Sequence, residues 1–307
     1  MPDAIALPQG VHFIQRGWLS SNSVLLIDQD QSVLIDTGYY SHAQQTLELV
    51  KHHLNGRALS TIINTHLHSD HCGGNAHLQA VFPKVTTWIP PGLAAEVHNW
   101  DPLALGYIGT GQHCPTFTAN HTLHIGQTFL IGGIHWQCFA APGHDPHSFI
   151  LFSPDVGICI TADALWENGF GVVFPEIEGE EGYDDVRASL DLIESLQASI
   201  IFPGHGAPFT DVAGALVRAR TRLNKFIDQP ATHALYAAQV LVKFKLLELQ
   251  RVDMRSFRDW SLTATHLAKI HQSHSTDRSF DDWFDFICND LVRSGAASLE
   301  GSDLINV

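Results

Sequence analysis

A short histidine-rich loop restricts the folds and functions open to this chain more than any other segment. The loop, at residues 65–74, directly follows a buried run with strand character at 61–63. Within it, four side chains able to bind a metal fall inside six residues: His66, His68, Asp70 and His71. Because side chains alternate along an extended chain, His66 and His68 can point to the same side. Asp70 and His71 can then turn toward a second centre where the chain bends into a helix.

The chemistry of these side chains points to a metal site. Imidazole nitrogens and a carboxylate oxygen suit Zn²⁺ or another divalent first-row ion. The alternative is a histidine-rich surface loop, and the position immediately after a buried strand argues against it. Three more such side chains each follow a predicted strand: His144 and His205, which lie beside Gly, and Asp163. A lone histidine after a strand is usually structural, but three positions in this order predict one shared metal site.

In these motifs the chain resembles the metallo-β-lactamase-fold hydrolase superfamily, over roughly residues 10–227. The resemblance implies two divalent metal ions, Zn²⁺ first, with Fe or Mn also fitting the ligands. It implies that the first ion is held by His66, His68 and His144. It implies that the second is held by Asp70, His71 and His205, with Asp163 bridging the two.

The mechanism follows from the two metals. Neighbouring cations would lower the pKa of a bridging water and polarise the carbonyl or phosphoryl oxygen of a substrate. The bridging hydroxide is then the nucleophile. Asp70 is the candidate catalytic residue, because it could orient this hydroxide or take its proton.

The pattern of strands and helices predicts an α+β chain. Two β-rich stretches, at 11–35 and 121–163, are each followed by helices, which favours sheet packed on sheet with helices outside. This agrees with the αββα metallo-β-lactamase sandwich that the resemblance implies. We expect a hydrolase domain at 1–229 and a helical domain at 230–307, where three helices and a terminal hairpin resemble a small winged-helix-like domain. Residues 99–118 are expected to be a long loop.

Differences from the sequence patterns of individual branches of the family narrow the range of expected substrates. A bridging Asp163 fits glyoxalase II-like thioesterases and lactonases, and also nucleases, better than true β-lactamases. No Lys or Arg occurs between residues 84 and 187, which argues against the glutathione thioesters of glyoxalase II. The candidate substrate-binding side chains are Trp166, Phe170 and Tyr107, and they would form an apolar pocket for an acyl chain or lactone. The alternative for these rings is a role as core anchors.

We therefore expect a dinuclear hydrolase that opens a thioester, lactone or ester bond in a small-molecule substrate. The alternatives are a metal-dependent nuclease for single-stranded RNA and a metal-binding redox or sensor protein. The net charge of −15 and the acidic helix around residues 281–285 argue against nucleic-acid binding. They favour a packing or homodimer role for the C-terminal domain.

The remaining composition bears on location. No apolar run of 18 residues is present, so we expect no membrane span. Five scattered cysteines, an odd number without a CxxC pair, read as reduced thiols and predict a cytoplasmic protein.

Overall fold

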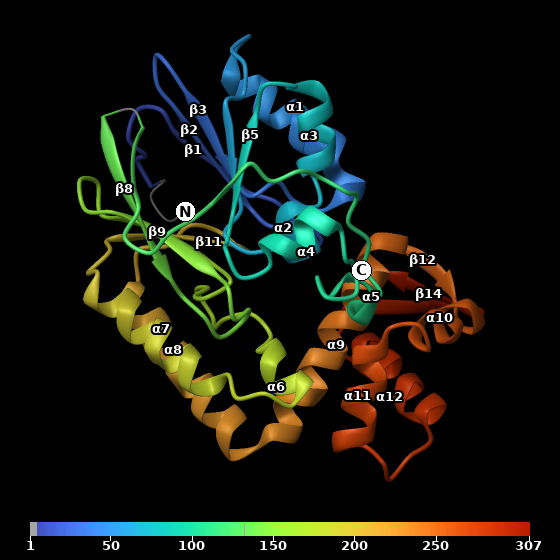
Figure 1. Cartoon of the computed structure of the whole chain (residues 1–307). Coiled ribbons are helices and arrows are strands. Elements are labelled where there is room, and N and C mark those ends of the chain that lie inside the picture. The colour runs from blue at the N-terminus through green and yellow to red at the C-terminus, as the bar shows by residue number, and fades with distance from the viewer. Residues whose placement is uncertain (1–4, 132) are drawn as a thin grey trace.

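The computed structural model describes residues 5–131 and 133–307, and two β-sheets lie at its centre (Figure 1). The first sheet has the strand order β1-β2-β3-β4-β5-β6; β1 to β3 are antiparallel and β3 to β6 are parallel. Its strands are β1 (Val11–Ile14), β2 (Ser23–Ile27), β3 (Ser32–Ile35), β4 (Thr61–Ile63), β5 (Thr86–Ile89) and β6 (His121–Thr122).

The second sheet has the order β11-β10-β9-β8-β7. Strands β7 to β10 are antiparallel, and β10 and β11 are parallel. The strands are β7 (Thr128–Ile131), β8 (Ile134–Ala140), β9 (Phe149–Ser153), β10 (Ile158–Ala162) and β11 (Ile200–Pro203).

The two sheets pack face to face through one apolar core. Leu26 and Ile35 of the first sheet belong to the same buried cluster as Trp136 and Leu151 of the second. Because neighbouring side chains of a strand point to opposite faces, Leu25 turns away from this cluster and packs under the outer helices. Burial on both faces explains why these strands are continuous apolar runs rather than alternating ones.

Helices cover the outer faces of both sheets. On the first sheet these are α1 (Ala43–Leu54), preceded by a 3-10 turn at Tyr40–His42, and α3 (Asn75–Val81). On the second they are α7 (Tyr183–Ser195) and α8 (Val212–Asp228). The αββα sandwich predicted from the sequence is therefore confirmed.

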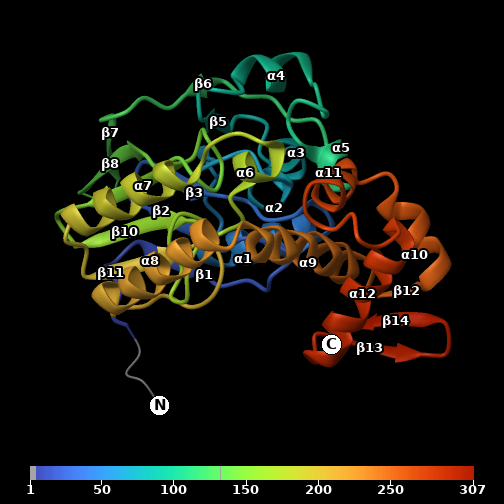
Figure 2. The same cartoon turned by 90° about the horizontal axis from the view of Figure 1, so that it is seen from below.

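The C-terminal region is helical with a small sheet, and α9 (Pro230–Leu249) joins it to the sandwich (Figure 2). The other helices are α10 (Met254–Ser261), α11 (Thr265–His274) and α12 (Phe280–Arg293). The expected hairpin is formed by β13 (Ala297–Glu300) and β14 (Asp303–Asn306), and β12 (Arg251–Asp253), which was not predicted, pairs with β14. The core of this region includes Val172 and Ile177, so it packs directly on the sandwich. A domain boundary at residue 230 stays a prediction.

Two connecting segments contain short helices. The segment at 99–118, predicted as a loop, contains the short helix α5 (Tyr107–Thr110), flanked by Gly106 and Gly111 in left-handed conformation. It is preceded by α4 (Ala94–Asn99). Helix α6 (Phe174–Glu178) lies in the connection that follows β10. The short helices α5 and α6 both contact α11, so the long connections are held against the C-terminal region.

Candidate metal centre and catalytic cavity

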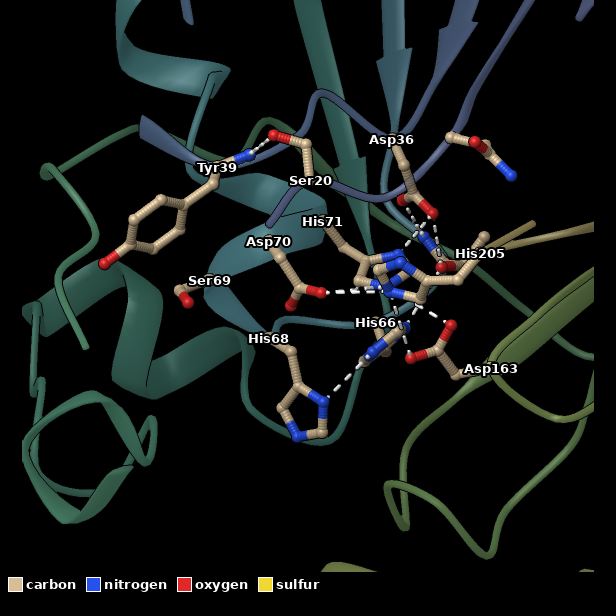
Figure 3. A network of polar contacts seen from close by, with 12 residues as sticks. Ser20, Asp36, Tyr39, His66, His68, Ser69, Asp70, His71, Asp163 and His205 are labelled. Atoms are coloured by element: carbon tan, nitrogen blue, oxygen red, sulfur yellow. Dashed lines mark hydrogen bonds and ion pairs between the residues drawn. The ribbon is translucent and has the colours of Figure 1, made fainter. Parts of the chain in front are cut away.

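All seven predicted ligands lie together at one edge of the two sheets. Four loops carry them: His66, His68, Asp70 and His71 follow β4, with the last two on α2 (Ser69–Cys72), while His144 follows β8, Asp163 follows β10 and His205 follows β11. Figure 3 shows Asp163 and His205 converging on the side chains of the segment that follows β4. Residues up to 139 positions apart in sequence meet here because the strand ends that precede them meet at one edge.

The first group of ligands consists of three imidazoles. His66 Nε2 lies 3.1 Å from His68 Nδ1, and that atom lies 2.8 Å from His144 Nε2. Burial, together with neighbouring histidines, lowers the pKa of His66 well below its usual value. Burial and His144 lower the pKa of His68 to about 4. Neutral imidazole is the form that binds a metal ion, so this group could hold one cation.

The second group adds a carboxylate to two imidazoles. Asp70 Oδ2 lies 3.2 Å from His205 Nε2 and 3.9 Å from His71 Nε2. Burial would raise the pKa of Asp70, but His71 and His205 outweigh burial and lower it. The carboxylate is therefore ionised at neutral pH. Its ligand atoms and those of the two histidines all lie within 4.8 Å of one another.

Asp163 lies between the two groups. Its Oδ1 is 3.5 Å from His71 Nε2, and its Oδ2 is 3.3 Å from His144 Nε2 and 3.8 Å from His205 Nε2. Burial would raise the pKa of Asp163, but His205 and His71 hold it well below the usual range. An ionised carboxylate that faces both groups has the position required of a bridging ligand.

His71 supplies the test of whether a cation fits. Its Nε2 is buried and has no hydrogen-bond partner among the described residues, although two carboxylates lie within 4 Å. Burial alone would lower the pKa of His71, but Asp36, Asp163 and Asp70 raise it well above its usual value. The surroundings of this nitrogen are therefore strongly negative. A divalent cation at Nε2 would complete the bonding of the nitrogen and balance the carboxylates, so the residues fit metal ions.

Asp36 is a site residue that the sequence reasoning missed. Its Oδ2 lies 2.7 Å from His71 Nδ1, and its two oxygens accept hydrogen bonds from the Thr65 amide (2.9 Å) and hydroxyl (2.7 Å). Asp36 has a φ of +58°, a conformation that Asp tolerates better than most residues. It directly follows strand β3, so the rule that found the other ligands would have found it too.

A cavity of about 350 Å³ opens beside the metal centre. Trp166 lines it, as predicted, and its Nε1 donates a hydrogen bond to Asp163 Oδ1 at 3.2 Å. Tyr107 also lines it, but the Tyr107 hydroxyl is already occupied by a hydrogen bond of 2.9 Å to the carbonyl of Leu67. Trp166 thus contacts both the cavity and the candidate bridging carboxylate.

The prediction that Phe170 binds substrate is wrong. Its side chain is 1 % exposed and belongs to the core between the second sheet and its outer helices. The ring packs edge-on against Phe226 and under the guanidinium of Arg222. Phe170 therefore acts as a core anchor, and Phe174, four residues later, lines the cavity instead.

The far wall of the cavity comes from the C-terminal region, which the sequence reasoning did not include. Its side chains are Tyr236, Val240, Leu241, Phe244 and His266. No Lys or Arg is found among the described residues that line the cavity. Five acidic residues line it: Asp70, Asp145, Asp163, Glu178 and Glu180. Beyond the metal ligands, the described lining is thus mainly apolar, and it contains carboxylates but no Lys or Arg.

Comparison with known proteins agrees with this site. The family model described as the metallo-beta-lactamase superfamily matches residues 16–205, so the chain belongs to that superfamily. The matched part begins before β2 and ends at the seventh candidate ligand. Together with the His/Asp cluster, membership makes the protein a metal-dependent hydrolase that binds divalent metal. The helices of the described residues include none long and apolar enough to cross a membrane.

Individual relatives are more distant. The chain is 28 % identical over 149 residues to a hydroxyacylglutathione hydrolase of Idiomarina loihiensis, covering 48 % of this chain and 47 % of that protein. It is 24 % identical over 273 residues to an atrochrysone carboxyl ACP thioesterase of Aspergillus fumigatus, covering 88 % of this chain and 54 % of that one. The chain thus spans about half the length of both relatives.

Among solved structures, the fold is similar to that of a metallo-beta-lactamase family protein of Thermus thermophilus. The TM-score is 0.55 at 19 % identity, covering 98 % of this chain and 100 % of the other. The C-terminal region is therefore included in the similarity of the fold.

Proposed function

We propose that this protein hydrolyses an ester-type bond, and first of all a thioester, in a small substrate with an apolar acyl group and an uncharged leaving arm. The observation that carries the proposal is the cavity, which joins the metal centre to an apolar wall without any Lys or Arg among its described residues. The names of two relatives, a hydroxyacylglutathione hydrolase and an ACP thioesterase, support thioester chemistry.

The charge of the cavity selects among thioesters. Glutathione and β-lactam substrates carry carboxylates, and a carboxylate beside Glu178 and Glu180 would be repelled rather than paired. An uncharged arm suffers no such repulsion. Val240, Leu241 and Phe244 would bury the acyl chain, and each buried methylene contributes about 0.8 kcal/mol to binding. Lactones and simple esters meet the same conditions and remain within the proposal.

In the proposed site, His66, His68 and His144 would hold one Zn²⁺ ion and Asp70, His71 and His205 a second, and Asp163 would be a ligand to both. Such ions lower the pKa of a bound water to near neutrality and polarise a carbonyl oxygen. The ionised Asp70 carboxylate lines the cavity and orients the attacking water or accepts its proton at one oxygen. Trp166 holds the Asp163 carboxylate in place through its indole N–H.

The RNA nuclease alternative gains no support from these observations. A nuclease needs cations along the path of the phosphate backbone, whereas the lining of this cavity is acidic. Asp281, Asp282 and Asp285 place three carboxylates on α12, the helix that would correspond to a recognition helix. Arg258 already pairs with Asp285, with Nη2 2.6 Å from Oδ2. A packing role for this region, or contact with a second copy of the chain, stays our prediction.

The test is hydrolysis by the zinc-loaded protein. The panel holds acyl thioesters of N-acetylcysteamine, the glutathione thioester of the same acyl group, lactones, aryl esters, a β-lactam and single-stranded RNA. We expect turnover of the uncharged thioester, with kcat/KM roughly tenfold or more above that of the glutathione thioester. Asp70→Ala should abolish it, and Asp155→Ala, a change at an exposed carboxylate far from the ligands, should not.

Two results would contradict the proposal. Preference for the glutathione thioester would show that the charge of the cavity does not select the substrate. Cleavage of RNA alone, lost in Asp70→Ala and weakening steeply with salt, would replace thioester hydrolysis with the nuclease reaction.

A further inference from the structure

Of the five histidines of the metal centre, three have a hydrogen-bond partner at the ring nitrogen that faces away from the ligand cluster, and His68 Nε2 has the Asp145 carboxylate at 3.8 Å. For His71 the partner is the Asp36 carboxylate at 2.7 Å, and for His144 it is the carbonyl of Val172 at 2.5 Å. His66 has the Thr65 hydroxyl at 3.1 Å. Such partners fix the plane and tautomer of a metal-binding imidazole.

His205 lacks such a partner. Its Nδ1 is buried and makes no hydrogen bond to any described residue, while its Nε2 faces Asp70 and Asp163. No hydrogen bond at Nδ1 therefore opposes rotation of the ring about its Cβ–Cγ bond, which would carry Nε2 away from the cluster. Contacts of another kind must fix the orientation of the ring.

An aromatic pair takes this place. The indole of Trp18 stacks on the imidazole of His205, with ring centroids 5.2 Å apart and planes 7° from parallel. The indole of Trp166 meets both rings edge-on, at 5.4 Å from each. Parallel stacking restricts tilting of the imidazole, and the perpendicular Trp166 limits its rotation. Trp18 is nevertheless 58 % exposed, on the connection between β1 and β2, at the rim of the cavity.

We propose that Trp18 is a positioning residue for His205, and that its indole does the work that a hydrogen-bond partner does for His66, His71 and His144. The inference rests on the proposed assignment of His205 to the second metal ion. A cation at Nε2 makes the imidazole ring more positive, and the face of an indole attracts positive charge. The stacking is therefore stronger when the second ion is bound. Binding of an ion at Asp70, His71 and His205 therefore depends on Trp18. Binding of an ion at His66, His68 and His144 does not.

The test measures metal binding and needs no substrate. Titration of the metal-free protein with Zn²⁺ against a chromophoric chelator gives the two affinities, and elemental analysis gives the stoichiometry. Trp18→Ala should lower the affinity for the second ion by about 10- to 100-fold, the range found when an outer partner of a metal ligand is lost. The affinity for the first ion should be unchanged. Trp18→Phe retains a flat ring and should recover most of this affinity.

Two further variants make the result specific. Trp18→Leu keeps an apolar side chain at this position but has no flat ring, so it should behave like Trp18→Ala. If the Ala protein does not fold, the difference in metal affinity between the Leu and Phe variants decides. Ile125→Ala removes an apolar side chain that is 73 % exposed outside the catalytic cavity, and it should bind both ions normally.

Normal affinity for both ions in Trp18→Ala and Trp18→Leu would overturn the inference. Equal weakening of both ions would overturn it too, because that result indicates a general disturbance of the fold. A wild-type protein that binds a single ion would refute the ligand assignment and this inference with it. Failure to hydrolyse any thioester, lactone or ester would instead refute the proposed function, and the metal titration would still decide the role of Trp18.

Discussion

The metal edge and the cavity wall opposite it are built from the chain in different ways. At the edge, each ligand lies in the segment just after a strand, so strand position and residue type together determine its place. At the wall, the side chains of α9 and α11 reach the cavity only because these helices pack against the sandwich. Each metal ligand can thus be recognised from a short stretch of sequence, whereas the residues of the wall are set by contacts between segments that are distant in the sequence.

The two regions are joined by a small number of polar contacts. The Tyr39 and Tyr40 hydroxyls donate hydrogen bonds to the Glu248 carboxylate on α9, at 3.1 and 3.0 Å. The amide of Val173 donates one to His233 Nε2, at the beginning of α9, at 3.0 Å. Val173 immediately precedes Phe174, so this last contact connects the wall to the segment that follows Asp163. Single substitutions can disturb the edge, the wall and the junction between them separately.

The largest effect is expected at the edge, from Asp163→Asn. The amide keeps the shape of the side chain but removes the charge that faces both ligand groups. We expect kcat/KM to fall by roughly 10³-fold or more, which corresponds to about 4 kcal/mol of transition-state stabilisation. Asp155→Asn, at an exposed carboxylate paired with His135, is the matched control and should be unaffected. A variant that keeps a tenth of the wild-type kcat/KM would show that Asp163 is no bridging ligand.

The junction should make stability depend on pH through His233. The side chain is 1 % exposed, and burial, Arg222 and His274 lower its pKa to about 4. The unfolded chain binds this proton near pH 6.5, so the contribution is complete above that pH. It is lost as the pH falls from about 6.5 to 4. The pKa difference corresponds to roughly 3 kcal/mol in the free energy of unfolding.

Urea unfolding of the wild type and of His233→Gln measures this contribution. The glutamine can still accept the Val173 hydrogen bond but does not titrate. The difference in unfolding free energy between the two proteins should change by most of that contribution between pH 7.5 and pH 4.5, with the wild type losing more. A difference that is constant with pH would mean that His233 is protonated as easily in the folded protein as in the unfolded chain.

The contrast between edge and wall also sets what could be predicted from the sequence. The loop at 65–74 and His144, Asp163 and His205 could be found because each combines a strand end with a recognisable ligand type. Asp36 has the same signal, since it follows β3 directly, and could have been found.

The lining of the cavity was harder to predict for a physical reason. Phe170 and Phe174 lie four residues apart in one irregular segment, and nothing in their spacing tells which ring faces the cavity. The turn of that segment against α9 decides it: Phe170 enters the core of the second sheet, while Phe174 lies beside His68, with ring centroids 5.0 Å apart. The contribution of α9 and α11 follows from packing of the C-terminal region, which no local pattern reveals.

A second change at the edge, Asp36→Asn, tests the support of a ligand rather than a ligand itself. Asparagine tolerates the left-handed conformation of this position, so the backbone should be preserved. The charge that holds His71 Nδ1 is lost, and we expect about 10- to 100-fold weaker metal binding. Chelator competition measures it, with Asp155→Asn again as the control. Unchanged metal affinity would show that the role of Asp36 is to hold Thr65 and not to orient His71.

The smallest effect is expected beside the wall, from Phe174→Ala on α6. The ring packs edge-on against His68 and His266 and lines the cavity, but it lies outside the ligand set. Its removal should raise KM for a long-chain acyl thioester about tenfold, because a buried hydrophobic contact of this size is worth about 1–3 kcal/mol. The kcat for an acetyl thioester should barely change, since the short acyl group does not reach the wall.

Phe280→Ala is the control for this last change, because Phe280 is also partly buried but packs in the C-terminal core away from the cavity. It should lower the thermal midpoint of unfolding without changing the ratio of the two KM values. If Phe174→Ala lowers kcat for both substrates equally, the ring supports His68 rather than the acyl chain. The division between a chemical edge and a selective wall would then fail at this position, and Phe174 would belong to the edge.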